Sequence, residues 1–339
     1  MNQAKKYLAV FCLTIIACLF TTMVKAKTPV ELHGKLRVEG NQIVGEHGKP
    51  VQLMGMSHFW SVWGGQNFYN KEVVDWLVKD WKVDVVRAAI AVDINQEGEG
   101  NLGWIYNKEG QFELAETLIR AAIDNGVYVI VDFHTHNTHT EHAKEFFEYL
   151  AKKYGRYPNL IWEPFNEPIR QSWEEISEFM NAVTSVIRPH SDNLIVAGTR
   201  QWSQLVNEAA DNPLPDKNTA YTLHFYAGTH GQELRDIADY ALSKGIALFI
   251  TEWGTSHADG GSDQIVHKES TKEWVEWALE RNLSMANWSV FDKAEASAAL
   301  NPGAPITGGW CPEKHLSVSG QFIRDMIRET NKAKYKKCR

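Results

Sequence analysis

The fold of this chain is decided by a short stretch of sequence, VYVIVDFH at residues 127–134. The stretch is an almost unbroken apolar run that ends in a polar side chain. Helix-like segments flank it on both sides, Phe112–Asn125 before it and His142–Tyr154 after it. A strand that is apolar on both faces and lies between helices is typical of a parallel sheet covered by helices. The stretch therefore predicts one β/α unit of such a sheet.

The same alternation continues along the chain in both directions. The segments that read as buried strands are Val51–Ser57, Val83–Ile90, Val127–His134, Leu160–Asn166, Asn193–Gly198, Ala220–Phe225, Ile246–Glu252 and Ser284–Val290. Apolar residues three and four positions apart mark helices at Lys71–Trp81, Phe112–Asn125, His142–Tyr154, Trp173–Arg188, Gln232–Lys244, Lys268–Arg281 and Ser317–Glu329. Eight strands that alternate with helices predict an α/β fold, a (β/α)8 barrel.

The first residues have the pattern of a signal peptide. Lys5 and Lys6 precede an apolar run from Tyr7 to Phe20, and small residues favour cleavage after Ala26. The run is shorter than the roughly 20 apolar residues that a membrane span needs. We therefore expect a secreted protein, extracellular or periplasmic, with no membrane attachment after cleavage.

Residues 27–339 are expected to form one catalytic domain with its barrel core at 48–330, because no Pro-, Ser- or Gly-rich linker interrupts them. The segment Leu36–Val44, with Gly40-Asn41 as its turn, predicts a β-hairpin that covers the lower end of the barrel. We expect this single-domain protein to be a monomer.

Charge and cysteine content exclude some partners and leave one question open. Loss of the signal peptide would change the formal charge from −7 to about −10, which disfavours nucleic acid as a partner. Cys311 and Cys338 would remain, and they can form either a disulfide or two unpaired thiols in an oxidising compartment.

Polar side chains appear where the predicted strands end. The catalytic groups of a (β/α)8 barrel project from the carboxyl ends of its strands. Candidates at these ends are Arg87, His134, Asn166, Glu167, His224, Tyr226, Glu252 and Trp288. Glu167 and Glu252 end the fourth and seventh strands, so they can face each other across a cleft. Such a carboxyl pair is typical of glycosidic bond cleavage, with retention at a separation of about 5–5.5 Å and inversion at about 6.5–9.5 Å.

The neighbours of the two glutamates predict different protonation states. Arg87 can stabilise Glu252 as an anion, while a partly desolvated Glu167 would keep its proton near neutral pH. Tyr226 can hydrogen-bond the nucleophile, and Asn166 can hold the 2-hydroxyl of the reacting sugar. His134 and His224 are candidates for orienting these groups or binding hydroxyls, although each histidine by itself also reads as a satisfied buried side chain.

The chain contains 13 tryptophans, and sugar rings stack on such surfaces. Five lie outside the predicted helices and are expected to face the cleft: Trp60, Trp63, Trp202, Trp288 and Trp310. Four lie on predicted helices and are expected in the core: Trp76, Trp81, Trp274 and Trp277.

The segment WEPFNEP at 162–168 resembles the Asn-Glu-Pro motif of glycoside hydrolase family 5, a large cellulase family of retaining (β/α)8 enzymes. Further segments resemble its endoglucanase subgroup in the same order, namely VVRAA at 85–89, VDFH at 131–134, LHFYAGTHG at 223–231, ITEWGT at 250–255 and ANWS at 286–289. The likeness runs from about Leu36 to Ile327. It implies an endo-β-1,4-glucanase that hydrolyses internal bonds of cellulose or a related β-glucan through a covalent glycosyl-enzyme, with no cofactor or metal.

The resemblance also implies roles for individual residues. Glu167 matches the acid/base and Glu252 the nucleophile. The remaining active-site set that it implies is Arg87, His134, Asn166, His224, Tyr226 and Trp288. Lys293 matches a position that touches sugar hydroxyls. The loop 57–63 departs from the family loop that often supplies a substrate-binding histidine; the substrate-binding candidates that depend on position alone are His58, Trp60, Trp63 and Trp202.

Three alternatives remain open from the sequence. His134, His136, His139 and His142 have the look of a metal site, which would make the protein a metal-dependent barrel hydrolase. The tryptophans would also serve a carbohydrate-binding protein without catalytic activity. Finally, the same retaining mechanism acts on mannan, xyloglucan, xylan or mixed-linkage glucan, and the shape of the pocket decides among these substrates.

Overall fold

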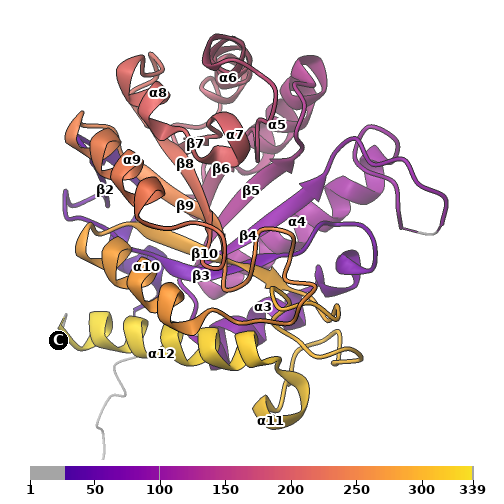
Figure 1. The fold of residues 1–339 in the computed structure, drawn as a ribbon. Helices are drawn as coiled ribbons and strands as arrows, with labels where there is room; N and C mark the ends of the chain where they lie inside the picture. Colours follow the sequence, from indigo (N-terminus) through magenta and orange to yellow (C-terminus); the bar gives the residue numbers. More distant parts are fainter. Residues whose placement is uncertain (1–26, 99, 338–339) are drawn as a thin grey trace, which may run out of the picture.

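A computed structural model describes residues 27–98 and 100–337, so the expected signal peptide and Cys338 lie outside the described residues. Eight parallel strands close into a barrel, in the order β10-β3-β4-β5-β6-β7-β8-β9 (Figure 1). The strands are β3 (Met54–His58), β4 (Val85–Ala91), β5 (Tyr128–His134), β6 (Leu160–Glu163), β7 (Ile195–Ala197), β8 (Thr219–Tyr226), β9 (Leu248–Gly254) and β10 (Ser284–Val290). The predicted (β/α)8 barrel is confirmed.

One predicted boundary is wrong in a place that matters for the site. The fourth barrel strand was expected at Leu160–Asn166, but β6 ends at Glu163, where its pairing with β5 also ends. Pro164 follows, and proline has no N–H with which to continue the ladder. Asn166 and Glu167 therefore lie in the loop between β6 and α6 rather than on the strand.

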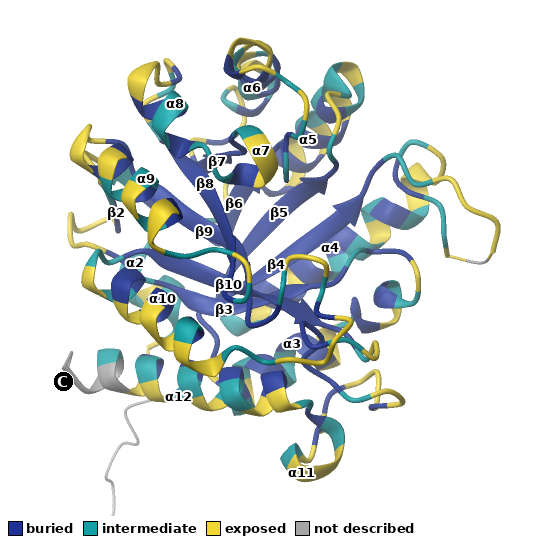
Figure 2. Cartoon of the chain, in the orientation of Figure 1, coloured by how far each residue is buried: buried dark blue, intermediate teal, exposed yellow. Residues whose placement is uncertain are grey.

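Helices surround the barrel and bury their apolar faces against it, while their outer faces are exposed (Figure 2). The longer ones are α3 (Lys71–Trp76), α4 (Lys108–Asn125), α5 (Thr140–Tyr154), α6 (Trp173–Ile187), α9 (Gln232–Ser243), α10 (Lys268–Glu280) and α12 (Val318–Lys337). The first of them continues into a π-helix, η2 (Leu77–Trp81), so one predicted helix consists of two parts. Short helices complete the set, namely α2 (Pro29–His33), η1 (Gly65–Phe68), α7 (Arg200–Ser203), α8 (Val206–Asp211) and α11 (Pro312–His315).

The predicted hairpin closes the amino end of the barrel. Strands β1 (Arg37–Glu39) and β2 (Gln42–Val44) pair antiparallel. Leu36 and Ile43 are buried in a cluster that also contains barrel residues such as Tyr128. This packing leaves the carboxyl end of the barrel for the site. Among the described residues, no helix combines the length and apolar character that crossing a membrane requires.

Candidate active site

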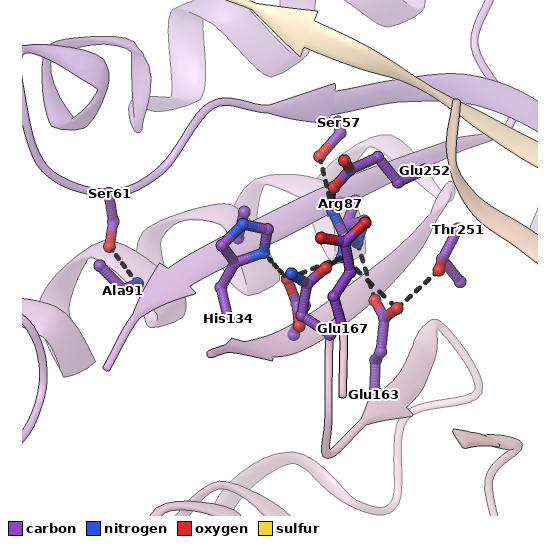
Figure 3. A network of polar contacts seen from close by, with 12 residues as sticks. Ser57, Ser61, Arg87, Ala91, His134, Glu163, Glu167, Thr251 and Glu252 are labelled. Carbon is purple, nitrogen blue, oxygen red and sulfur yellow. Dashed lines mark hydrogen bonds and ion pairs between the residues drawn. The ribbon is translucent and has the colours of Figure 1, made fainter. Parts of the chain in front are cut away.

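Arg87 lies at the centre of a polar cluster inside the carboxyl end of the barrel (Figure 3). It was expected near the end of its strand, but it lies in the middle of β4 and is fully buried. Its Nε donates to Glu163 Oε2 at 2.7 Å and its Nη1 donates to Glu252 Oε2 at 3.0 Å. Its Nη2 donates to Asn166 Oδ1 at 2.6 Å and lies 2.9 Å from Asp132 Oδ2. One guanidinium thus orients groups from four other segments of the chain.

The cluster contains three carboxyl groups for this one positive charge. Burial disfavours the charge on Arg87, but Asp132, Glu163 and Glu252 outweigh it and raise the pKa of Arg87. Burial raises the pKa of Asp132 to about 8 and that of Glu163 to about 7, while Arg87 opposes both shifts. Burial and the charge of Arg87 therefore act in opposite directions on these two carboxyl groups.

Removal of this charge has a predictable effect on folding. We expect Arg87→Met to lower the free energy of unfolding by about 3–5 kcal/mol, because buried carboxylates lose their only cation. Urea unfolding measures the change. The control is Lys71→Met, which breaks the half-exposed pair with Asp75 and should cost less than about 1 kcal/mol. Equal losses in the two variants would contradict the central role of Arg87.

Glu252 lies on β9 with both carboxylate oxygens engaged. Oε2 accepts from Arg87, and Oε1 accepts from the Tyr226 hydroxyl at 2.6 Å. Burial and the neighbouring Glu252 raise the pKa of Tyr226 well above its usual value, so the phenol keeps its proton and donates. The side chain of Glu252 is 6% exposed. These contacts fix the orientation of the Glu252 carboxyl group, because both of its oxygens accept hydrogen bonds.

Glu167 is in a different environment. Its side chain is 13% exposed, and Oε1 forms a 2.8 Å hydrogen bond with Nδ1 of His224 on β8. Burial raises the pKa of Glu167 to about 7, against the opposing charges of His136 and Arg87. Burial also lowers the pKa of His224 to about 4, so this ring is neutral. Glu167 can therefore carry a proton at neutral pH and donate it.

The structure brings the two glutamates together. One carboxylate oxygen of Glu167, one of Glu252 and a ring nitrogen of His224 lie within 4.8 Å of one another. This spacing fits direct attack by one carboxylate on the sugar, since an inverting pair needs about 6.5–9.5 Å to admit a water molecule. A cavity of about 450 Å³ opens beside these residues and is also lined by Tyr226 and Trp202.

His134 forms part of an aromatic surface next to the pair. Its Nδ1 is hydrogen-bonded to Asp132, which also forms an ion pair with Arg87. Its ring stacks on Trp288, with centroids 5.3 Å apart and planes 5° apart, and meets Trp60 edge-on at 4.0 Å. The rings of His134, Trp60 and Trp288 therefore contact one another beside the polar cluster, and we call these three residues the aromatic face.

Three buried polar residues of the cluster were not expected from the sequence. They are Asp132, Glu163 and Thr251. Each lies within an apolar strand, and a carboxylate within a buried strand is unusual unless it is paired. That signal was present in the sequence for the two acids, but it was read as part of the apolar runs. The threonine carried no such signal, because Thr is common in strands.

Two expected tryptophan platforms lie near the site, one formed by Trp60 and Trp63 beside His134 and the other by Trp202 in the cavity lining. Trp60 and Trp63 have ring centroids 5.4 Å apart, and Trp63 is 36% exposed with its Nε1 donating to Gln96 at 2.7 Å. Trp202, on α7, is 46% exposed and lines the cavity next to Glu167. Its backbone has a positive φ of 57°, which is unusual for a bulky residue. Strain of this kind tends to gather at functional sites.

Two aromatic assignments were wrong. His58 is fully buried and packs against Tyr69 with ring centroids 5.1 Å apart, so it offers no surface to a substrate. The reason is that His58 still belongs to β3, and its ring lies in the packed core. Trp310 is also buried: it packs edge-on against Trp81 at 6.2 Å and donates to the Pro305 carbonyl at 2.7 Å.

Lys293 lies near the aromatic residues of the site, and the helix tryptophans lie in or against the core. Lys293 Nζ lies 2.6 Å from Glu295 Oε2 and 5.9 Å from the centre of the Phe59 ring. Phe59 in turn packs against Trp288 at 5.4 Å, so Lys293 lies near the aromatic face. Of the four helix tryptophans expected in the core, Trp81, Trp274 and Trp277 are buried there, and Trp76 is partly buried against the same cluster. The Cys311 thiol is exposed and donates to Glu313 Oε2 at 3.1 Å.

The four histidines considered for a metal site do not converge. His134 binds Asp132, His136 Nδ1 lies 3.0 Å from the carbonyl oxygen of Glu167, and His139 lies 2.9 Å from Asp93. His142 meets the Trp104 ring edge-on. Within residues 27–98 and 100–337, the acids and histidines whose ligand atoms do come together are Glu167, His224 and Glu252. The hydrogen bonds already described account for that group without a metal.

A (β/α)8 barrel with two unlike glutamates facing each other at its carboxyl end defines a class of glycoside-cleaving enzymes. Residues 44–294 match the family model described as Cellulase (glycosyl hydrolase family 5). The chain belongs to this family.

Known relatives agree with that assignment. The chain is 43% identical over 323 residues to Endoglucanase N of Pectobacterium atrosepticum, covering 93% of this chain and 70% of the relative. It is 46% identical to Endoglucanase A of Evansella cellulosilytica, covering 84% of this chain and 57% of the relative. A structure from Cytophaga hutchinsonii has a TM-score of 0.87 at 45% identity and covers 92% of this chain and all of that one. The catalytic domain of Thermobifida fusca endoglucanase Cel5A has a TM-score of 0.82 at 31% identity, covering 89% of this chain and 100% of its own.

Proposed function

We propose that the chain is a retaining endo-β-1,4-glucanase that hydrolyses internal bonds of cellulose or a related β-glucan. The observation that carries the proposal is the pair of Glu167 and Glu252, whose nearest oxygens lie within 4.8 Å while their surroundings favour opposite protonation states. The relatives are endoglucanases, and the Thermobifida fusca domain has also been solved with cellotetraose. A β-1,4-glucan is therefore the substrate that we assign to this site.

In the first step Glu167 and Glu252 act on opposite sides of the bond. Glu167 gives its proton to the glycosidic oxygen while Glu252 attacks the anomeric carbon. The bond between this carbon and the leaving oxygen breaks, and the sugar becomes an ester of Glu252. Tyr226 and Arg87 hold the attacking carboxylate in place. The side-chain oxygen of Asn166, Oδ1, accepts from Arg87. The side-chain NH2 group of Asn166 can therefore donate to the 2-hydroxyl of the sugar.

In the second step the two glutamates reverse their tasks. The Glu167 carboxylate takes a proton from a water molecule, and the resulting hydroxide attacks the anomeric carbon. The ester bond to Glu252 breaks, and both carboxyl groups return to their starting states. Two displacements at one carbon restore the β configuration of the product.

The aromatic platforms explain how a long chain would be held. Trp60 and Trp63 offer one stacking surface beside His134, and Trp202 offers a separate one in the cavity lining beside Glu167. Sugar rings on both sides of the cleaved bond are what internal cleavage requires. We assign Lys293 to sugar hydroxyls near the aromatic face.

Loss of a platform should weaken binding more than chemistry. We expect Trp202→Ala to raise the KM for cellotetraose about two- to tenfold with a smaller change in kcat, because one stacked ring contributes about 0.5–1.5 kcal/mol. Steady-state kinetics measure both constants. Tyr240→Ala is the control, since Tyr240 is a similarly exposed aromatic residue on α9 that lies outside the cleft lining. A fall in kcat with an unchanged KM would contradict the assignment.

The test of the proposed function is a panel of polysaccharides with product analysis. Carboxymethylcellulose, mixed-linkage glucan, xyloglucan, xylan and mannan are compared, together with the anomeric configuration of the first product by proton NMR. We expect β-configured oligosaccharides of several lengths from carboxymethylcellulose. An α-configured first product would contradict retention, and failure to release reducing sugar from every polymer would favour a carbohydrate-binding protein.

We also propose that the protein is exported and acts as a monomer. The signal-peptide pattern of residues 1–26 supports export. Export also fits the proposed activity on a polymeric β-glucan.

A further inference from the structure

A chain of hydrogen bonds leads from Glu167 away from the cleft. Glu167 Oε1 is bonded to His224 Nδ1 at 2.8 Å, and His224 Nε2 is bonded to Thr251 Oγ1 at 2.9 Å. The Thr251 hydroxyl donates to Glu163 Oε1 at 2.6 Å. His224, Thr251 and Glu163 are all buried. The chain therefore joins the acid at the cleft to a second acid inside the barrel, shielded from solvent.

The far end of the chain decides the direction of its hydrogen bonds. Arg87 donates to both oxygens of Glu163, from Nε at 2.7 Å and from Nη2 at 3.4 Å. A guanidinium can only donate, so Arg87 favours the anionic form of Glu163. The Thr251 hydroxyl has a single proton, which it gives to this carboxylate. Thr251 must then accept from His224, which places a proton on Nε2.

The near end of the chain follows from the state of the imidazole. Burial lowers the pKa of His224 to about 4, so the ring is neutral and carries only one proton. With that proton on Nε2, Nδ1 has a lone pair and can only accept. The bond between His224 Nδ1 and Glu167 Oε1 therefore requires Glu167 to be the donor.

We propose that Glu163, Thr251 and His224 form a proton-positioning chain that keeps a single shared proton on Glu167, with Arg87 holding the far carboxylate ionised. This inference rests on the proposed function, in which Glu167 is the acid. Glu163 and Thr251 are positioning residues because they act through His224 and touch neither sugar nor reacting atoms.

The alternative state of the chain has the same number of protons. Three transfers connect the two states: Glu167 Oε1 to His224 Nδ1, His224 Nε2 to Thr251 Oγ1, and Thr251 Oγ1 to Glu163 Oε1. They leave Glu163 neutral and Glu167 ionised, with no proton gained or lost. In this state Arg87 lies beside a neutral carboxylic acid and loses its ion pair with Glu163. Glu167, now ionised, accepts a hydrogen bond from His224 Nδ1. The position of Arg87 beside Glu163 thus selects the state in which Glu167 is an acid.

The arrangement also serves the second step. After Glu167 has given its proton to the leaving group, its carboxylate faces the lone pair of His224 rather than an N–H. The anion is left without the donor that would stabilise it, so it takes a proton from the attacking water more readily. The charged and titratable groups around Glu167 are Arg87 on β4, Asp132 on β5, His136 after β5, Glu163 on β6, His224 and Tyr226 on β8, and Glu252 on β9.

Glu163→Gln reverses the chain. Arg87 Nε requires an acceptor at 2.7 Å, so the amide oxygen takes the place of Oε2 and the NH2 group takes the place of Oε1. The NH2 group then donates to Thr251, whose hydroxyl turns to His224 Nε2. The imidazole proton moves to Nδ1 and donates to Glu167, which favours its anion. We expect the basic limb of kcat/KM for cellotetraose to move down by about one pH unit, lowering the rate above the limb by on the order of tenfold.

Variants at Thr251 test the chain without changing charge. Thr251→Val removes the shared hydroxyl and should also move the basic limb to lower pH, while Thr251→Ser should keep it at the wild-type pH. Glu163→Gln should add a smaller shift in the Thr251→Val background than in the parent, because only the direct effect of the Glu163 charge on Glu167 then remains. Glu116→Gln is the matched control: this acid pairs with Lys153 between α4 and α5, outside the cleft, and its replacement should leave the limb in place.

Two further readouts separate the inference from other causes. A dinitrophenyl β-cellobioside needs no proton on its leaving group. Glu163→Gln should therefore not move the basic limb of kcat/KM for this substrate. A shift equal to that on cellotetraose would indicate general disruption of the site and would overturn the proposal. Nitrogen-15 NMR should show the His224 ring protonated on Nε2 in the parent and on Nδ1 in Glu163→Gln. The proposal would also be overturned if Glu163→Gln left both the basic limb of the pH profile and the protonated nitrogen of His224 unchanged. A parent enzyme inactive on both substrates would instead reject the proposed function.

Discussion

Replacement of Glu252 by glutamine is expected to lower kcat for β-glucan hydrolysis by on the order of 10⁵-fold, since removal of a nucleophile leaves only binding and electrostatic effects. The amide cannot form the glycosyl ester. Its single oxygen can accept from Arg87 in place of Oε2, and its NH2 group can donate to the Tyr226 hydroxyl oxygen in place of Oε1, so the fold should persist. Release of reducing sugar from carboxymethylcellulose measures the activity, and the melting temperature checks the fold.

The anomeric configuration of a rescued product identifies the nucleophile more directly. In Glu252→Ala, azide should enter the vacated space and attack an activated β-cellobioside from the face that Glu252 occupied, giving an α-glycosyl azide. Glu116→Gln, away from the cleft, should behave as the parent enzyme. A variant at 252 that is as active as the parent would refute the assignment of Glu252.

Loss of Glu167 should have the second largest effect and should depend on the leaving group. We expect Glu167→Ala to lower kcat/KM for cellotetraose by on the order of 10³-fold, because protonation of a sugar leaving group contributes about 10²–10⁴-fold. A dinitrophenyl leaving group departs without a proton, so the loss on that substrate should be far smaller. Azide should here give a β-glycosyl azide, the opposite of the product expected from the variant at Glu252.

The pH profile gives an independent check on Glu167. Burial raises its pKa to about 7, so the acid is protonated below that pH and loses its proton as the pH rises through it. The kcat/KM for cellotetraose should therefore fall above about pH 7 in the parent enzyme. The Glu167→Ala variant should show no such basic limb. A limb that persists in the variant would assign the ionisation to another group.

The catalytic cluster is costly to fold and depends on its geometry. Asp132, Glu163 and Glu252 are buried beside Arg87, and buried ion pairs seldom stabilise a fold beyond what apolar residues would achieve. Through Arg87 the three carboxyl groups orient one another and Asn166, and Glu163 also anchors the hydrogen-bond chain that leads to His224. Function, rather than stability, accounts for these charges.

The sequence alone determined the class of fold and indicated the pair of glutamates that we propose as catalytic. Strands that are apolar on both faces and alternate with amphipathic helices have few ways to bury their surfaces, and eight such units close into a barrel. The barrel then brings the carboxyl ends of its strands to one face, so polar residues near those ends meet there. Glu167, Glu252 and Tyr226 could be identified for this reason before any coordinates.

Only the tertiary structure decided which polar residues contact one another and which aromatic residues reach the cleft. His58 and Trp63 lie five residues apart, yet one is buried in the core and the other is exposed beside Gln96. The chain from Glu167 to Glu163 joins residues of β8 and β9 to the segment around β6, and no sequence spacing specifies hydrogen bonds across strands. Local periodicity reports which face of an element is buried, whereas contacts between elements depend on how their side chains pack in three dimensions.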